Sequence, residues 1–277
     1  MGNRYFEVLE RAFSFLEKQG IEGYSILFVF LERKGWTKTD WLLHLKEEIS
    51  PEEEQQIAED LKQLGQNYPP QYLLGYSDFF EHRFLVNEHT LIPRPETEEL
   101  VDRCLKENLN QPLIVVDVGT GTGAIGISLK LARPDWQVTA IDISKEALKI
   151  AEQNAARLGA TVDFIHGDGL KPIKGTKIDI LISNPPYISN AEWDLMDKSV
   201  RTFEPKTALF AENDGLAIYQ QLAEEAKDWL NPNGKIYLEI GFQQGQAVKQ
   251  LFQQAFAHKQ VDIAQDLSGN DRMIIVS

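Results

Sequence analysis

The sequence has little cysteine and no long apolar run. Cys104 is the single cysteine among 277 residues, so no disulfide can form within the chain, which is typical of a reducing compartment. The longest apolar run, residues 26–31, is too short to span a bilayer. The opening stretch MGNRYFEVLE is charged and does not have the pattern of a secretory signal peptide. We therefore expect a soluble, cytoplasmic protein that does not bind a membrane.

Positive charge is also scarce. Lys and Arg number 28 against 42 Asp and Glu, which gives a formal net charge of −14. The nearest approach to a basic cluster, at residues 171–177, is flanked by Asp168 and Asp179 and predicts a solvated loop. Such a chain repels a duplex nucleic acid, so we expect no direct nucleic-acid binding. The five histidines are scattered without metal-ligand spacing, and we expect no metal site.

The amino-terminal part of the chain predicts a small helical domain over residues 1–75. Apolar residues recur at helical spacing over residues 5–16, and Gly20 ends that run. Thr37 or Thr39 is placed to cap a further helix. The stretch SPEE at residues 50–53 is a capping box with proline at the first helical position.

Residues 76–94 are predicted to form a β-hairpin linker. Apolar and polar residues alternate over residues 79–91, and Asn87 with Glu88 supplies a polar turn. Prolines at positions 69, 70, 93 and 95 bracket the segment.

Strands and helices alternate from residue 95 to residue 277. Strands are expected near residues 113–118, 137–142, 161–165, 178–183, 235–240 and 272–276. Helices are expected near residues 96–107, 124–132, 145–158, 215–230 and 243–257. This alternation predicts an α/β fold, in which a mostly parallel sheet is covered on both faces by helices. Ligands of such folds bind at the carboxyl ends of the strands.

A glycine-rich turn, VVDVGTGTGAIG, ends the first of these strands. Glycine permits a tight turn and lets a ligand approach the main chain closely. The second strand ends at Asp142, whose carboxylate can accept hydrogen bonds from both hydroxyls of a ribose. The pattern fits a nicotinamide dinucleotide and S-adenosylmethionine equally well, so it leaves the cofactor open. The candidate cofactor-binding residues here are Gly119, Thr120, Gly121, Thr122, Gly123 and Asp142.

Asp168 follows the third strand in the stretch HGDGL. From this position it either reaches the amino group of an adenine or caps a turn as an ordinary loop aspartate. We count Asp168 and Gly169 among the candidate cofactor residues, with both interpretations open.

The stretch SNPPYI, residues 183–188, decides the cofactor. An amide nitrogen is a poor nucleophile because its lone pair is delocalised. Two acceptors that hold its two N–H groups favour the pyramidal geometry needed to attack a methyl sulfonium. The side-chain carbonyl of Asn184 and the backbone carbonyl of Pro185 can supply these acceptors, while Tyr187 offers a ring for packing. The sequence therefore predicts a nitrogen methyltransferase that uses S-adenosyl-L-methionine.

Site roles follow from this interpretation. We assign catalysis to Asn184, Pro185 and Tyr187, and substrate contact to Asn184, Pro185, Pro186 and Tyr187. Asn184 is also expected to contact the cofactor.

Longer motifs carry a more specific resemblance. PQYLLG at residues 70–75, LIPRPETE at 91–98, FEP at 203–205, LEIG at 238–241 and DLSG at 266–269 accompany NPPY. Together they resemble the protein-(glutamine-N5) methyltransferases of peptide chain release factors, the PrmC or HemK family, over nearly the whole chain from about residue 69. The family's fold is a Rossmann-like methyltransferase domain preceded by a helical domain.

The resemblance implies a particular reaction. It implies methyl transfer to the side-chain amide nitrogen of the glutamine in the Gly-Gly-Gln motif of class-1 release factors, with the helical domain helping to hold that protein. An amine methyltransferase that acts on nucleic acid, at adenine N6, or on another protein is the alternative. We expect a monomer.

Two details of the resemblance stay open. Some family members carry an aromatic residue near the adenine, where this chain has Gly169 and Leu170, so Leu170 or Ile143 is expected to pack there. Arg94 and Glu98 form either a charged pair near the substrate or a capped helix start with first-turn acids.

Overall fold

The computed structural model describes residues 2–108, 111–175 and 177–277. The chain divides into two compact units. We call Met1–Tyr76 together with Asp197–Phe203 the helical unit, and Ser77–Met196 together with Glu204–Ser277 the α/β unit. Among the residues that the structure describes, no helix has the length and apolarity needed to cross a membrane.

The helical unit confirms the predicted helical amino-terminal part. Its helices are α1 (Tyr5–Lys18), α2 (Tyr24–Lys34), α3 (Lys38–His44), α4 (Pro51–Leu64), α5 (Pro70–Leu74) and α9 (Lys198–Phe203). Thr37, not Thr39, caps α3 by accepting a hydrogen bond from the Asp40 N–H, and Ser50 caps α4 in the same way. Buried side chains such as Leu16 and Val29 form a core of this unit's own.

A β-hairpin, β1 (Tyr76–Phe79) and β2 (His82–Leu85), is present as predicted, but its turn is not where we expected it. The turn lies at Phe80 and Glu81, whose φ angles are 46° and 65°. Neither residue is a glycine or an asparagine, so the usual sequence signal of such a turn is missing. A turn does form at Asn87 and Glu88, where the Thr90 N–H donates to the Asn87 carbonyl, but it follows the end of β2, so its prediction as the hairpin turn is wrong.

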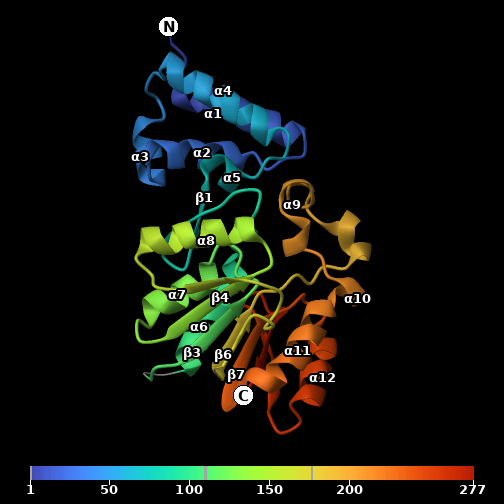
Figure 1. Ribbon diagram of the computed structural model, residues 1–277. Coiled ribbons are helices and arrows are strands. Elements are labelled where there is room, and N and C mark those ends of the chain that lie inside the picture. Colours follow the sequence, from blue (N-terminus) through green and yellow to red (C-terminus); the bar gives the residue numbers. More distant parts are fainter. Residues whose placement is uncertain (1, 109–110, 176) are drawn as a thin grey trace. The chain divides into compact units, whose positions relative to one another are not determined.

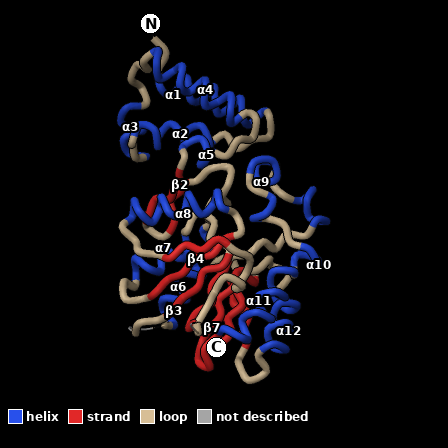
Figure 2. Tube along the Cα trace, viewed as in Figure 1, coloured by secondary structure: helices blue, strands red, loops and turns tan. Residues whose placement is uncertain are grey.

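The α/β unit is built on a seven-stranded sheet with the order β5-β4-β3-β6-β7-β9-β8. Figure 2 shows its strands in red, with helices in blue on either side. The strands are β3 (Ile114–Val118), β4 (Gln137–Asp142), β5 (Asp163–His166), β6 (Ile178–Ser183), β7 (Leu230–Glu239), β8 (Val261–Gln265) and β9 (Asp271–Val276). Strands β3 to β7 pair in parallel, and β9 is antiparallel to both of its neighbours. The mostly parallel sheet is confirmed, while β8 was not predicted.

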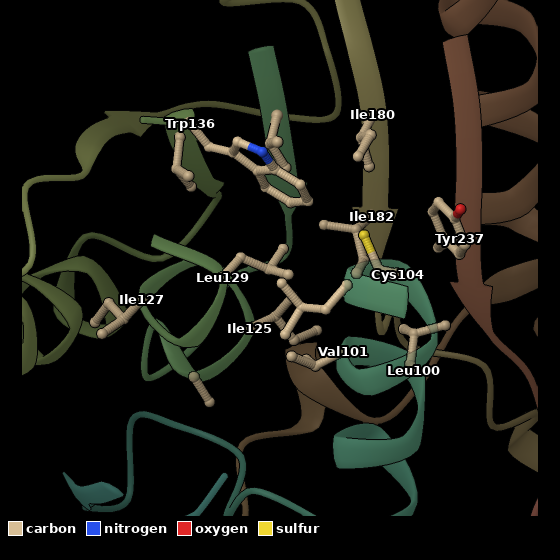
Figure 3. Packing of buried hydrophobic residues seen from close by; sticks show 14 of the residues in the cluster. Leu100, Val101, Cys104, Ile125, Ile127, Leu129, Trp136, Ile180, Ile182 and Tyr237 are labelled. Carbon is tan, nitrogen blue, oxygen red and sulfur yellow. The ribbon is translucent and has the colours of Figure 1, made fainter. Parts of the chain in front are cut away.

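Helices cover both faces of this sheet (Figure 1). One face packs against α6 (Pro95–Glu107), α7 (Ala124–Ala132) and α8 (Lys145–Leu158), and the other against α11 (Ala217–Trp229) and α12 (Gly245–Ala255). Successive residues of β6 serve opposite faces: Ile180 and Ile182 belong to the first core and Leu181 to the second. Figure 3 shows the first core, where Leu100 and Cys104 of α6 lie near these strands.

The chain changes direction between β3 and β6. From β3 it proceeds outward to β4 and β5, then returns to place β6 on the other side of β3. The segment from β6 to α11 contains short helices that we did not predict, namely η1 (Asn190–Leu195), α9, η2 (Lys206–Ala208) and α10 (Glu212–Gly215). This change of direction forms a crevice at the carboxyl ends of β3 and β6, the usual ligand position in open α/β sheets.

Candidate active site

A cavity of about 290 Å³ lies at the carboxyl ends of the parallel strands. The lining residues that end or follow β3 to β6 are Val118, Gly119, Gly121, Asp142, Ile143, Gly167, Asp168, Gly169, Ser183, Asn184, Pro185 and Pro186. Every lining residue belongs to the α/β unit. The structure thus brings the glycine turn, Asp142, Asp168 and three residues of the Asn-Pro-Pro-Tyr segment to one cavity.

The glycine turn divides into residues that face the cavity and residues that shape the turn. Gly119 and Gly121 have φ angles of 72° and 56°, and a Cβ atom on either would meet no atom within 4 Å. Gly123 has a φ angle of 82°, but a Cβ there would lie 2.6 Å from Ile127 Cδ1. Gly119 and Gly121 therefore leave open space for a ligand, while Gly123 allows α7 to pack.

The two threonines of the turn do not line the cavity. The Thr120 hydroxyl donates to Asp117 Oδ2 at 2.6 Å, and the Thr122 carbonyl accepts from Asn154 Nδ2 at 3.0 Å. Asp117 Oδ2 also accepts from the Gly126 N–H at 3.0 Å. Burial raises the pKa of Asp117 to about 7, although these two hydrogen bonds lower it. Asp117 thus stabilises the turn on the side that faces the protein interior, away from the cavity.

Asp142 stabilises the turn on the side that faces the cavity. Its Oδ2 accepts from the Gly121 N–H and its Oδ1 from the Ser144 N–H, both at 2.8 Å. Burial raises the pKa of Asp142, and the two hydrogen bonds oppose that shift. A carboxylate has about four acceptor sites, so each oxygen retains one for a further donor. The carboxylate can therefore accept from hydroxyls of a ligand in the cavity.

Asp168 lines the cavity but already has two protein partners. Its Oδ1 accepts from Gln221 Nε2 at 2.9 Å, and its other oxygen pairs with Lys171. The hydrogen bond from Lys171, followed by that from Gln221, lowers the pKa of Asp168. Its side chain thus joins the end of β5 to α11.

Of the two residues proposed to pack on an adenine, only one faces the cavity. Leu170 is fully buried and does not line it, whereas Ile143 lines it with 60% of its surface exposed. Phe210 and Ile218 provide further apolar surface. Ile143 is therefore the candidate that the geometry favours.

The Asn-Pro-Pro-Tyr segment follows β6 and is held by contacts to the surrounding chain. Asn184, Pro185 and Pro186 line the cavity. The Tyr187 carbonyl accepts from Gln244 Nε2 at 2.9 Å. Gly215 lies so close that a Cβ on it would be 2.0 Å from that carbonyl oxygen. Tyr187 itself does not line the cavity, and burial raises the pKa of its phenol.

Arg94 and Glu98 do not pair with each other. Arg94 Nη2 lies 2.5 Å from Glu204 Oε1, and the Ile92 N–H donates to Glu204 Oε2. Glu98 is a first-turn acid of α6 and accepts from the Phe80 N–H. Glu204 is buried and belongs to the FEP motif, so this ion pair with the partly exposed Arg94 connects two of the sequence motifs.

Several lining residues were missed in the sequence. They come from the segment before α6, from the start of α8, from the η2 region and from α11: His89, Thr90, Leu91, Ser144, Ala147, Thr207, Ala208, Phe210, Ile218 and Gln221. Leu91 begins the LIPRPETE motif, but none of these residues lies in a local pattern that indicates cofactor chemistry. Among the described residues, no group of three or more His, Cys, Asp or Glu side chains could hold a metal ion.

This site belongs to an S-adenosylmethionine-dependent methyltransferase. Its class is defined by the sheet order, the glycines that face the cavity, the acid at the end of β4 and the Asn-Pro-Pro-Tyr segment after β6. Two family models match the chain: the PrmC N-terminal domain over residues 7–75 and the methyltransferase small domain over residues 97–211. The chain belongs to the release factor glutamine methyltransferase family.

Relatives along the whole chain carry this assignment. The release factor glutamine methyltransferase of Enterococcus faecalis is 65% identical over 99% of both chains. That of Lactococcus lactis is 49% identical over 91% of this chain and 93% of the relative. A solved methyltransferase structure from Pyrococcus furiosus superimposes with a TM-score of 0.53 at 21% identity, covering 70% of this chain and 87% of that one, and it supports the fold alone.

Proposed function

We propose that the protein transfers a methyl group from S-adenosyl-L-methionine to the side-chain amide nitrogen, N5, of the glutamine in the Gly-Gly-Gln motif of class-1 release factors. One observation carries the proposal beyond family membership. Asn184 lines the same cavity as Gly119, Gly121 and Asp142, and its amide nitrogen already donates to Thr97. Its carbonyl oxygen is therefore the part of the side chain left for a substrate.

The residues of the cavity fit the cofactor. The open space at Gly119 and Gly121 admits a ligand against the main chain. Asp142 retains acceptor sites for the two ribose hydroxyls. Ile143 offers apolar surface for the adenine. When bound, S-adenosyl-L-methionine supplies an electrophilic methyl group.

Asn184 and Pro185 act on the substrate amide. Its two N–H groups donate to Asn184 Oδ1 and to the Pro185 carbonyl, which favours a pyramidal nitrogen whose lone pair is less delocalised into the amide carbonyl and faces the methyl group. No strong base is required before the transfer, because the nitrogen becomes acidic only afterwards. The hydrogen bond from Gln244 to Tyr187 holds the segment that carries both acceptors.

Labelled S-adenosylmethionine tests the substrate and the site together. We would incubate it with the protein and a purified class-1 release factor, beside the same factor with its Gly-Gly-Gln glutamine changed to alanine. Label on the first factor alone is the expected result. Label on both factors would overturn the assigned site, and label on neither would overturn the assigned substrate.

Asn184→Ala tests the mechanism. We expect methyl transfer to fall by roughly 100-fold or more, because one oriented hydrogen-bonding group at a reacting centre is worth that much. The affinity for S-adenosylmethionine, measured by calorimetry, should fall much less than methyl transfer, because Gly119, Gly121 and Asp142 are unchanged. Wild-type turnover in this variant would contradict the role given to Asn184.

We also propose that the protein acts as a monomer on a protein substrate and does not bind nucleic acid directly. The formal net charge of −14 supports this. Light scattering after size exclusion would measure the mass, and a mass of two chains would contradict the proposal.

A further inference from the structure

A chain of hydrogen bonds leads from Asn184 into the protein interior. Asn184 Nδ2 donates to Thr97 Oγ1 at 3.0 Å, and the Thr97 hydroxyl donates to Glu239 Oε2 at 2.6 Å. Thr97 is on the first turn of α6, and Glu239 is the last residue of β7. Three elements of the α/β unit thus meet at the side chain that is proposed to hold the substrate.

The direction of these hydrogen bonds fixes the orientation of the amide. At a pH above about 7 the Glu239 carboxylate is ionised and can only accept, so Thr97 donates its single hydroxyl proton to Glu239. The Thr97 oxygen is then available to Asn184 only as an acceptor, which attracts the Nδ2 group. The other end of the amide, Oδ1, is left for the cavity that Asn184 lines.

The burial of Glu239 is costly and calls for an explanation. Glu239 is 2% exposed and Thr97 is 4% exposed. Burying a carboxylate is unfavourable, and burial raises the pKa of Glu239 to about 7 even though Thr97 and Arg272 lower it. An apolar residue at the end of β7 would avoid that cost. The hydrogen bond to Thr97 is the contact through which this carboxylate reaches the site.

We infer that Thr97 and Glu239 are positioning residues for methyl transfer, which set the orientation of the Asn184 amide so that its oxygen faces the substrate nitrogen. The kinetic test of this inference depends on the proposed function. Thr97 and Glu239 do not line the cavity, so they act through Asn184 and not on the substrate.

Thr97→Val removes the hydroxyl and keeps the shape of the side chain. We expect kcat to fall by about 10- to 100-fold, since a misoriented contact to a reacting group costs this much. KM for the release factor and the calorimetric Kd of S-adenosylmethionine should stay within about twofold. Thr97→Ser should return kcat to within about threefold of the wild-type value. A Thr97→Val enzyme with wild-type kcat would overturn the inference.

A double-mutant cycle separates positioning from a general structural effect. If Thr97 acts through Asn184, adding Thr97→Val to Asn184→Ala should cost nothing further. Two effects that multiply would show independent roles and overturn the inference. The matched control is Ser128→Ala, which removes a buried hydroxyl of α7 that has no partner within the described residues, and should leave kcat unchanged.

Glu239→Gln provides a second variant if Thr97→Val folds poorly. A glutamine amide can donate to Thr97 as well as accept from it, so the direction of the hydrogen bonds is no longer fixed. We expect an intermediate loss of kcat at pH 8, where the wild-type carboxylate is mostly ionised. Circular dichroism would confirm the fold of each variant. Wild-type kcat in a folded Glu239→Gln enzyme would overturn the inference.

Nuclear magnetic resonance of the free enzyme reads the orientation without a substrate. The side-chain amide protons of Asn184, assigned by their loss in Asn184→Ala, should exchange slowly in the wild type and faster in Thr97→Val. Equal exchange in both would overturn the inference. Protected amide protons in a wild-type enzyme that methylates no release factor would support the positioning network and overturn the proposed function.

Discussion

Three carboxylates are buried near the carboxyl edge of the sheet, and each fixes a neighbouring residue. Asp117 holds the glycine turn from behind, Asp142 holds it from the front, and Glu239 holds Thr97. Burial raises the pKa of all three. Stability alone does not favour such groups, since each loses hydration on folding. At the scale of single residues, the candidate site therefore relies on Asp117, Asp142 and Glu239, which are buried at the cost of losing their hydration.

Asp142→Asn tests the cofactor site. We expect the Kd of S-adenosylmethionine to rise by roughly 10- to 100-fold, because hydrogen bonds to a charged group are worth about 1.5–3 kcal/mol. Isothermal calorimetry measures this directly. The matched control is Asp163→Asn, which changes an exposed aspartate of the neighbouring strand β5. A Kd within twofold of the wild-type value would argue against a ribose contact at Asp142.

Asp117→Asn tests the cost of a buried carboxylate. Because the folded-state pKa is raised from 3.8 to about 7, the wild-type carboxyl contributes stability below pH 4 that is lost as the pH rises through 7. The asparagine does not titrate. The free energy of opening of the variant, relative to the wild type, should therefore rise between pH 5 and pH 8, by on the order of 3 kcal/mol.

Hydrogen exchange on peptides from β3 would measure this opening free energy for the α/β unit alone. Parallel pH curves for Asp117→Asn and the wild type would show that the raised pKa of Asp117 does not contribute to stability.

At the scale of elements, the sequence predicted what local patterns encode. The periodic helices and the buried strands of the α/β unit lie within a few residues of their predicted positions, and the ends of β3 and β6 carry the predicted motifs. The hairpin turn was misplaced because Phe80 and Glu81 adopt positive φ angles without glycine or asparagine. The strand β8 was missed because its five residues, VDIAQ, alternate too little to stand out.

The positioning network was missed for a different reason. Asn184 was found because its motif is local, but its partner Thr97 is 87 positions away, and Glu239 is 142 positions from Thr97. Both lie in motifs that the sequence displayed, PRPETE and LEIG. Only the packing of α6 against β7 shows that these motifs share one set of hydrogen bonds.

Gly215→Ala tests the join between α10, α11 and the Asn-Pro-Pro-Tyr segment. The glycine has a φ angle of +81°, and a Cβ would lie 2.0 Å from the Tyr187 carbonyl oxygen, so that segment must move. We expect kcat to fall by about tenfold or more. The matched control is Gly269→Ala, with a φ angle of +83° and no atom within 4 Å of a Cβ. Equal activity in the two variants would contradict the join.

At the scale of the whole molecule, the helical unit and the α/β unit have separate hydrophobic cores. The helical unit has its own core, which includes Leu16, Val29 and Leu64. The cavity with all its lining residues belongs to the α/β unit. Cofactor binding should therefore depend on the two cores of the α/β unit, and we expect the helical unit to contact the protein substrate.

Leu16→Ala tests this division. Leu16 is fully buried in the core of the helical unit, so its truncation should destabilise that unit by about 2–5 kcal/mol. Hydrogen exchange should quicken in peptides from α1, α2 and α4 and stay unchanged in those from β3 and β6. The matched control is Leu42→Ala on α3, where the side chain is 67% exposed and little change is expected.

The binding measurements on Leu16→Ala complete the argument. The Kd of S-adenosylmethionine should stay within about twofold of the wild-type value, because every residue that lines the cavity belongs to the α/β unit. KM for the release factor should rise if the helical unit contacts it, as we propose, because the folded form of that unit is then less populated. A parallel loss of cofactor affinity would show that the two units fold as one cooperative body, and the division of tasks would then be wrong.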